Sequence, residues 1–333
     1  MFAMLAGIAG YLAGALCILL TLAYIAAWCA LRRQRAAHGP FSLDVFRRLT
    51  PDGSKMLETR GGLRLRCVCS DGKCASDAPL LLLVHGFMGC AETWQLITPL
   101  LTRSGFRTLA VDLVGSGYSD KPPGSAFDYT LRAQGDALCD LLDSLDVRDA
   151  IVVGHSSGGV VAAHVAATSK RVRGAVLIAP GLLRVKQAFL SYLFGPFLDF
   201  IVSKFAAADA RERSFIRAHA DPAAANPEIL AAFKLPFELD ARRTLDALAA
   251  SVKAYEPPYA ELVPAMRVPA RCVWAEHDKI NPPTEAAKLA EIAAEAGGGE
   301  RLSSVVLKSC GHYVQHEKAQ ELADEIAVFA KTL

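Results

Sequence analysis

The sequence lacks an excess of charge of either sign, since 36 Lys and Arg residues stand against 34 Asp and Glu residues. A nucleic-acid-binding protein normally carries a basic domain or stripe, so this balance gives no electrostatic reason to expect such a partner. The sequence is not poor in hydrophobic residues either, since they make up 52% of it. That composition excludes a disordered chain. A length of 333 residues allows one large α/β domain or two small ones.

The cysteines lack the pattern of a secreted, disulfide-bonded protein. Of the nine cysteines, Cys17 and Cys29 lie in an apolar N-terminal stretch, which leaves the odd number of seven for the rest of the chain. Cys67, Cys69 and Cys74 are close together, but no second ligand pair follows at the spacing of a zinc finger. We therefore expect free thiols in a reducing compartment and no metal or organic cofactor.

Charged residues, histidine and proline are absent from residues 1–31. An apolar run of this length exceeds the roughly 20 residues that a helix needs to cross a bilayer. Arg32, Arg33 and Arg35 follow at once, so we expect a membrane anchor over 1–31 and a basic juxtamembrane segment over 32–60. A cleaved signal peptide is the alternative, but basic residues before the apolar run are lacking too. The positive-inside rule places the arginines and the domain behind them on the cytoplasmic side.

The remaining sequence alternates short apolar runs with helix-like stretches. The apolar runs predict strands at 62–68, 80–84, 108–113, 150–153, 175–179, 271–275 and 304–307. Amphipathic stretches predict helices at 130–145, 158–167, 283–296 and 317–329. This alternation favours an α/β fold with a mostly parallel sheet covered by helices. Residues 181–264 contain no clear strand, so we expect a helical cap between core segments 61–180 and 265–333.

The sharpest chemical signal is the G-x-S-x-G sequence at 154–158, which directly follows a predicted strand and precedes a helix. A sharp turn there brings the strand and the helix close together, so Gly154 and Gly158 are both required. The turn holds the hydroxyl of Ser156 at the top of the sheet. A serine hydroxyl is a poor nucleophile unless a base takes its proton, so the motif predicts an acid and a histidine downstream.

Both partners are present in the required order. Asp278 lies in the loop after the strand at 271–275, and His312 lies in the loop after the strand at 304–307. Glu276 is the rival acid, but it lies nearer to the end of its strand. His316 is the rival base, but it stands at the start of the last predicted helix. The order serine, acid, histidine therefore predicts a catalytic triad of Ser156, Asp278 and His312.

Acyl transfer also requires backbone N–H groups that stabilise an oxyanion. The residue after the nucleophile supplies one of them, which is Ser157 here. The loop after the strand at 80–84 supplies the second, from Phe87, while Gly86 permits the tight turn. We expect His85 to hold this loop, although a histidine without that role at the end of a strand is an equal alternative.

The motifs resemble those of the α/β-hydrolase superfamily of serine hydrolases. The resemblance rests on His85-Gly86-Phe87, the 154–158 motif, Asp278, Gly311-His312 and a D-x-x-G-x-G-x-S loop that starts at Asp112. It covers roughly residues 61–333. It implies an eight-stranded, mostly parallel sheet, a helical cap after the sixth strand and a structural role for Asp112. With its anchor, the chain is similar in architecture to membrane-anchored monoacylglycerol-lipase-type hydrolases. Serine at position 156, in place of aspartate, argues against epoxide hydrolase and haloalkane dehalogenase activity.

Apolar residues crowd one part of the predicted cap. They are expected to form an acyl-chain tunnel or a membrane-facing lid, with ordinary helix packing as the alternative, and the substrate-binding candidates are Phe189, Leu193, Phe194 and Phe197. The sequence thus predicts a membrane-anchored serine hydrolase that cleaves carboxylic esters, namely acylglycerol-like lipid esters. A C–C bond hydrolase of diketone-type substrates and a non-catalytic membrane scaffold on the same fold are the alternatives.

Overall fold

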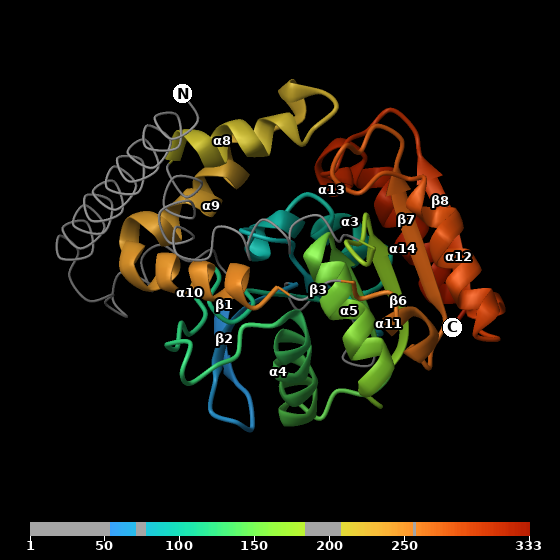
Figure 1. The fold of residues 1–333 in the computed structure, drawn as a ribbon, viewed down its shortest axis with the longest axis horizontal. Coiled ribbons are helices and arrows are strands. Elements are labelled where there is room, and N and C mark those ends of the chain that lie inside the picture. The colour runs from blue at the N-terminus through green and yellow to red at the C-terminus, as the bar shows by residue number, and fades with distance from the viewer. Residues whose placement is uncertain (1–53, 71–77, 184–207, 256–257) are drawn as a thin grey trace, which may run out of the picture.

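The computed structural model describes residues 54–70, 78–183, 208–255 and 258–333 (Figure 1). The predicted anchor at 1–31, most of the predicted segment 32–60 and the four substrate-binding candidates of the cap lie outside the described residues. Within the described ranges, no helix is both long enough and apolar enough to cross a membrane.

Eight strands form one sheet in the order β1-β2-β4-β3-β5-β6-β7-β8. The β1–β2 and β2–β4 pairs are antiparallel, and all the others are parallel. This confirms the mostly parallel eight-stranded sheet. The strands are β1 (Ser54–Glu58), β2 (Arg64–Cys69), β3 (Leu80–Val84), β4 (Arg107–Val111), β5 (Ala150–His155), β6 (Val172–Ile178), β7 (Ala270–Ala275) and β8 (Leu302–Leu307). The sequence patterns predicted every strand except β1, which lies within the segment 32–60.

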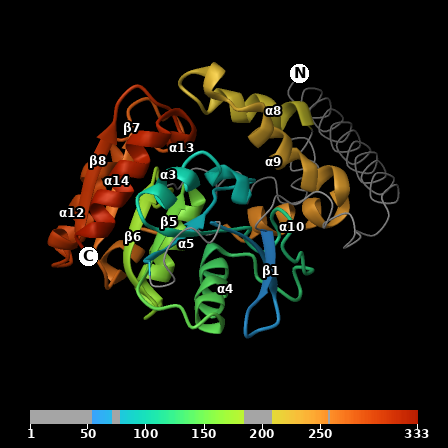
Figure 2. The ribbon, with the colours of Figure 1, turned by 180° about the vertical axis from the view of Figure 1, so that it is seen from behind.

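Helices cover both faces of the sheet (Figures 1 and 2). On one face lie α4 (Leu131–Ser144), α5 (Ser157–Thr168) and α12 (Glu285–Glu295), and on the other lie α3 (Thr98–Arg103) and α14 (Ala319–Lys331). A hydrophobic core lies on each face of the sheet, and alternate residues of β3 point into one or the other. Leu82 and Val84 pack with α4 and α5, while Leu81 and Leu83 pack with α3 and α14. A strand buried on both faces needs such a continuous apolar run.

The cap contains α8 (Ala208–Arg217), η3 (Pro222–Ala224), α9 (Pro227–Leu239), α10 (Ala241–Lys253) and α11 (Leu262–Ala265). As expected, no strand occurs among the described residues between β6 and β7. The start of α9 is encoded locally, because Asn226 Oδ1 accepts hydrogen bonds from the amides of Glu228 and Ile229, at 2.8 and 3.2 Å.

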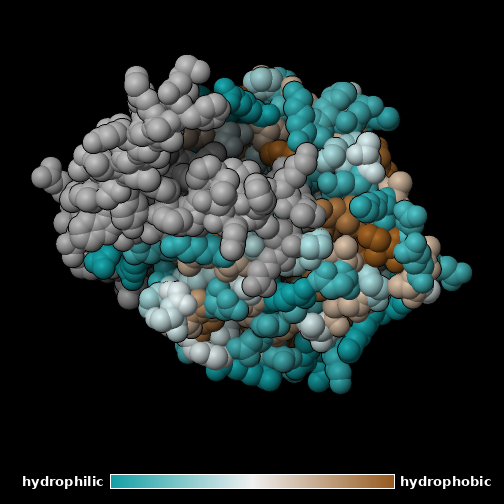
Figure 3. Space-filling model, in the orientation of Figure 1, coloured by the Kyte–Doolittle hydropathy of each residue, from teal (hydrophilic) through white to brown (hydrophobic). Residues whose placement is uncertain are grey.

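The cap lies directly on loops that follow strands of the sheet (Figure 1). A Cβ atom added to Gly115, in the loop after β4, would lie 2.9 Å from the Cβ of Ala247 in α10. One added to Gly311, in the loop after β8, would lie 2.5 Å from the amide nitrogen of Ala220. Ligands of open α/β sheets bind at this edge. On the face shown in Figure 3, hydrophilic residues cover most of the described surface, and an apolar area lies on the side of the C-terminal elements.

Candidate active site

Ser156 occupies a strained turn between β5 and α5. Its φ and ψ are 56° and −119°, and a positive φ costs an L-residue on the order of 1–2 kcal/mol. Hydrogen bonds hold the turn, because the Ser156 amide donates to the Ile178 carbonyl at 2.9 Å and its carbonyl accepts from the Gly159 amide at 2.9 Å. The side chain therefore projects from a rigid backbone at the N-terminal end of α5.

The two flanking glycines are required by close backbone approach. A Cβ added to Gly154 would lie 2.1 Å from the carbonyl oxygen of Gly158. One added to Gly158 would lie 2.3 Å from the carbonyl oxygen of His85. Both distances are far below van der Waals contact, so no side chain fits at either position. The strand, the helix and the loop after β3 therefore meet at this turn.

Asp278 and His312 form a buried pair. Oδ2 of Asp278 lies 2.7 Å from Nδ1 of His312, and the two side chains are 0% and 6% exposed. Because a carboxylate only accepts hydrogen bonds, Nδ1 carries the proton and leaves Nε2 as the basic nitrogen. Oδ1 of Asp278 accepts from the amides of Ile280 and Asn281, at 2.7 and 3.0 Å. Both carboxylate oxygens are therefore committed as acceptors.

The rival residues lie in different surroundings. Glu276 is partly exposed, pairs with Lys308 at 2.9 Å and accepts from the Ser309 amide at 3.0 Å. His316 is not at the start of the last long helix as predicted but in α13 (Val314–Glu317), where its Nδ1 lies 3.1 Å from Nε2 of His219. Among the described residues, neither rival is hydrogen-bonded to the Asp278–His312 pair.

His155 links His312 to the turn at Ser156. Nε2 of His155 lies 2.9 Å from the carbonyl oxygen of His312, and the two ring centroids are 4.6 Å apart. Asn281, in the loop that holds Asp278, donates from its Nδ2 to the carbonyl of Ala179 in the loop after β6, at 2.7 Å. The loops after β5, β7 and β8 thus bring Ser156, Asp278 and His312 to one end of the sheet. Sequence reasoning missed the contributions of His155 and Asn281, since no motif marks them.

The loop after β3 lies beside the nucleophile position. A Cβ added to Gly86 would lie 3.1 Å from the Cβ of Ser156. The Gly89 amide donates to the Gly86 carbonyl at 3.0 Å, which closes a tight turn around Phe87 and Met88. No hydrogen bond from the described residues uses the amide of Phe87 or that of Ser157. Both predicted oxyanion donors therefore lie next to Ser156 in sequence or in space, with N–H groups that no described residue accepts from.

His85 holds this loop in place, in agreement with the first of the two sequence interpretations. Its Nδ1 lies 2.7 Å from the Gly86 carbonyl, which only accepts, so Nδ1 carries the proton. Its Nε2 accepts from the Leu113 amide at 3.1 Å. One neutral imidazole thereby ties the loop after β3 to the loop after β4.

Asp112 has the structural role that the resemblance implies. Its buried carboxylate accepts from the amides of Ala91 and Tyr118, at 2.7 and 2.9 Å, and pairs with Arg66 at 3.3 Å. Arg66 is fully buried and also pairs with Glu92. Cys90, Glu92 and Asp112 approach one another closely enough to hold a cation, but Arg66 already neutralises both carboxylates. Burial raises the pKa of the Cys90 thiol well above its usual value, so the donor set fits an internal ion pair better than a metal.

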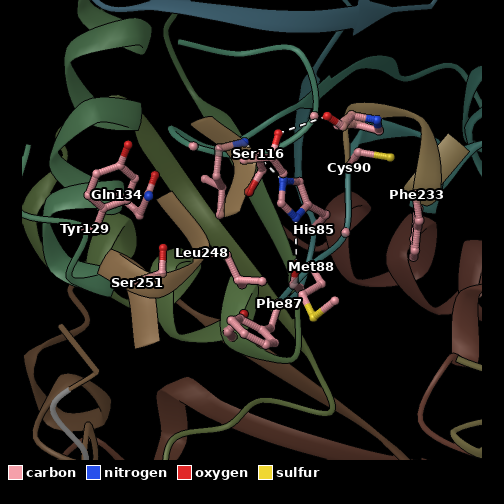
Figure 4. Close-up of a pocket in the computed structure, with 18 of the residues that line it drawn as sticks. His85, Phe87, Met88, Cys90, Ser116, Tyr129, Gln134, Phe233, Leu248 and Ser251 are labelled. Carbon is pink, nitrogen blue, oxygen red and sulfur yellow. Dashed lines mark hydrogen bonds between the residues drawn. The ribbon is translucent and has the colours of Figure 1, made fainter. Parts of the chain in front are cut away.

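A cavity opens on the oxyanion side of the turn (Figure 4). The loops after β3 and β4 supply one wall, and the cap helices α9 and α10 supply another. Its lining is mainly apolar, and the described cap residues that face it are Phe233, Pro236, Phe237, Thr244, Leu248 and Ser251. Phe87 and Ser157 belong to the same lining. Ser156, Asp278 and His312 are not part of the lining, so the cavity reaches the candidate oxyanion residues and stops beside the predicted triad.

Four histidines around the site are buried and neutral. Burial lowers the pKa of His316 to about 3 and lowers those of His85 and His219. Burial, with the neighbouring His312 second, holds the pKa of His155 well below its usual value. An unfolded histidine titrates near pH 6.5. The unfolded chain therefore binds more protons than the folded protein below that pH, and stability is lost as the pH falls.

Acidification from pH 7 to pH 5 is expected to lower the free energy of unfolding, and His316, whose pKa lies at about 3 in the folded protein, should account for about 2 kcal/mol of the loss. Urea unfolding at both pH values measures the loss. Replacing His316 with glutamine, which can still donate to His219, should reduce the loss by about 2 kcal/mol. His277→Gln, at a side chain that is 55% exposed, is the control and should leave the loss unchanged. An equal loss in the wild type and His316→Gln would contradict a neutral His316.

Comparisons with known proteins agree with this architecture. The sequence profile of the alpha/beta hydrolase family matches residues 81–325. The uncharacterized hydrolase YugF of Bacillus subtilis is 25% identical over 75% of this chain and 89% of its own length. A thermophilic esterase from Thermogutta terrifontis superposes with a TM-score of 0.66 at 22% identity, over 84% of this chain and 98% of its own.

A membrane phospholipase A, described as a bacterial virulence factor, also has a TM-score of 0.66, at 20% identity. The superposition covers 100% of this chain and 99% of that one. At such identities these structures establish a common fold. With a family profile that matches most of its length, the chain belongs to the alpha/beta hydrolase family and is a hydrolase of that type.

Proposed function

We propose that this protein is a serine hydrolase that cleaves carboxylic esters through Ser156, His312 and Asp278. The observation that carries the proposal is the buried Asp278–His312 pair, which meets the strained turn of Ser156 through His155. A base oriented by a carboxylate, beside a serine with uncommitted amides around it, is the arrangement that acyl transfer requires.

The chemistry follows from the proton positions. Nε2 of His312 takes the proton of the Ser156 hydroxyl while its oxygen attacks the ester carbonyl, and Asp278 stabilises the imidazolium that forms. The amides of Phe87 and Ser157 donate to the oxyanion of the tetrahedral intermediate. His312 then gives its proton to the leaving alcohol, and an acyl-enzyme remains on Ser156. Water, activated by the same imidazole, releases the acid.

The residues favour an ester over other substrates of this fold. Position 156 is serine, whose acyl ester water can hydrolyse at the carbonyl. A C–C bond hydrolase would be favoured by cationic or polar anchors in its cap, but none of the described residues that line the cavity is Lys or Arg. The polar cap residues in the lining are Thr244 and Ser251, and their hydroxyls donate to the carbonyls of Pro236 and Ala247. An apolar lining instead suits an acyl chain.

We further propose that the ester is a lipid ester and that residues 1–31 anchor the enzyme in a bilayer, with the catalytic domain on the cytoplasmic side. The charge-free run over 1–31 supports the anchor. A membrane phospholipase A shares the fold, and a lipid ester would be a substrate of the same chemical class. An anchored enzyme meets membrane-dissolved substrate without leaving the surface.

Hydrolysis of p-nitrophenyl esters from acetyl to palmitoyl is expected to show a rate optimum at medium or long acyl chains. The reason is that each buried methylene adds about 0.8 kcal/mol of favourable transfer energy in an apolar cavity. The measurement is kcat/KM for each ester with the purified full-length protein in detergent. A maximum at acetyl would contradict a lipid ester, and no turnover at any length would contradict ester hydrolysis.

A variant at one cap position tests whether the cavity holds the acyl chain. Ser251 lines the cavity from α10 (Figure 4), and its hydroxyl donates within the helix to the Ala247 carbonyl at 2.9 Å. Ser251→Phe fills the cavity and should move the optimum to shorter esters. Ser251→Ala keeps the cavity open and is the matched control. An unchanged profile in both variants would place the acyl chain elsewhere.

A further inference from the structure

We propose that Glu317 is a positioning residue for His312, which ties the loop of the catalytic histidine to the cap segment 218–221. The inference rests on the proposed function, because Glu317 is assigned to position His312, the base of the proposed reaction. It goes further in making the seated cap part of the catalytic machinery rather than only a cover for the substrate.

The carboxylate of Glu317 joins two distant segments. Its Oε2 accepts from the amide of Gly311 at 2.7 Å. Its Oε1 accepts from the amides of Ala220 and Asp221, at 2.8 and 3.0 Å. A carboxylate that accepts three backbone N–H bonds forms charge-assisted hydrogen bonds, which are stronger than neutral ones. Glu317 thus clamps the residue before His312 to the segment that follows α8.

The cap segment in turn contacts His312 itself. The amide of His312 donates to the carbonyl of Ala218 at 2.7 Å. Gly311 has no side chain between the two segments, and a Cβ there would lie 2.7 Å from the same carbonyl oxygen. The backbone of the cap segment therefore contacts the backbone of the loop that holds His312, and this approach requires glycine at position 311.

The polar groups of His312 are thereby held from three sides. Its amide binds the cap at Ala218, its carbonyl accepts from Nε2 of His155, and its Nδ1 donates to Asp278. Asp278 and His155 belong to the core, so the cap bond is the one that depends on how the cap is seated. Loss of the Glu317 clamp would free the segment 218–221 and shift His312 relative to Ser156.

A second contact between the same segments lies beside the clamp. The ring of His219 stacks on that of Tyr313, with centroids 4.9 Å apart, and its Nε2 accepts from Nδ1 of His316 at 3.1 Å. This packing keeps the cap near the core when the clamp is lost. The expected result of the loss is therefore displacement of His312 by a fraction of an ångström, not detachment of the cap.

Replacing Glu317 with glutamine tests the proposal, because the side chain keeps its shape but turns an acceptor oxygen into an NH2 group that faces backbone N–H groups. Glu321→Gln is the matched control, since Glu321 is a 53% exposed residue that pairs with Lys318 at 3.3 Å and has no other ion pair among the described residues. We expect kcat for p-nitrophenyl butyrate to fall about 10- to 100-fold in Glu317→Gln, because small misplacements of catalytic groups have effects of this size. KM should be unchanged, and Glu321→Gln should match the wild type.

Two readouts separate positioning from a general loss of structure. The rate at which a fluorophosphonate labels Ser156 should fall in parallel with kcat, because both steps need the same base. The low-field proton resonance of His312 Nδ1–H should move in Glu317→Gln and stay in place in Glu321→Gln. If Glu317→Gln unfolds more readily, the resonance is compared at a temperature where both variants are folded. Equal kcat and an unmoved resonance would overturn the proposal.

The two hypotheses fail in different ways. A wild-type protein that neither hydrolyses esters nor is labelled at Ser156 would overturn the proposed function, and the resonance of His312 would still test the clamp. An active wild type with an equally active Glu317→Gln variant would overturn the clamp and leave the proposed function standing.

Discussion

Ser156→Ala is expected to lower kcat for p-nitrophenyl esters by about 10⁶-fold, the loss typical of removing the nucleophile of a serine hydrolase. The reason is that His312 then has no hydroxyl to deprotonate and no acyl-enzyme forms. The turn between β5 and α5 should keep its geometry in this variant. Its geometry depends on Gly154, Gly158 and backbone hydrogen bonds, and alanine has no more bulk than serine.

The experiment measures kcat and KM for the variant and the wild type, together with covalent labelling by a fluorophosphonate. Ser169→Ala, at the opposite end of α5, is the matched control and should behave as the wild type. Labelling should disappear in Ser156→Ala alone. A variant that retains more than a few per cent of the wild-type rate would exclude Ser156 as the nucleophile.

The parts of the site that could be predicted from the sequence are those in which local chemistry and strand order coincide. Gly154, Ser156 and Gly158 are adjacent in sequence, and the sharp turn they form is a local event. Asp278 and His312 each follow a strand that the sequence predicts, β7 and β8. Because the carboxyl ends of parallel strands meet at one edge of the sheet, the order of these residues predicted that they lie together.

The parts that could not be predicted depend on distant or backbone partners. β1 contains the adjacent apolar residues Met56 and Leu57 but no alternation, and it exists because it pairs with β2. The predicted helix 317–329 corresponds to α14, which begins two residues later, because Lys318 departs from helical geometry at φ −134° and ψ 46° and Glu317 ends the separate helix α13. Glu317 resembles any surface glutamate in the sequence, and its cap partners are backbone amides 97 and 96 residues away.

Asp278→Asn is expected to lower kcat by about 10⁴-fold, with the fold intact. The structure gives a specific reason. Oδ1 of Asp278 accepts from the amides of Ile280 and Asn281, so the oxygen of the introduced asparagine must occupy that position. Its NH2 group then takes the place of Oδ2 and faces Nδ1 of His312.

An NH2 group donates hydrogen bonds, so Nδ1 of His312 must become the acceptor and the ring proton must move to Nε2. In that tautomer Nε2 cannot take the proton of Ser156. Glu276→Gln is the matched control, because Glu276 is the neighbouring carboxylate and its pair with Lys308 lies at the surface, where solvent screens the attraction. The measurement is kcat for both variants with the same ester, beside thermal unfolding to verify the fold. A large loss in Glu276→Gln with a small loss in Asp278→Asn would assign the acid to Glu276, because only the group that orients His312 controls its tautomer.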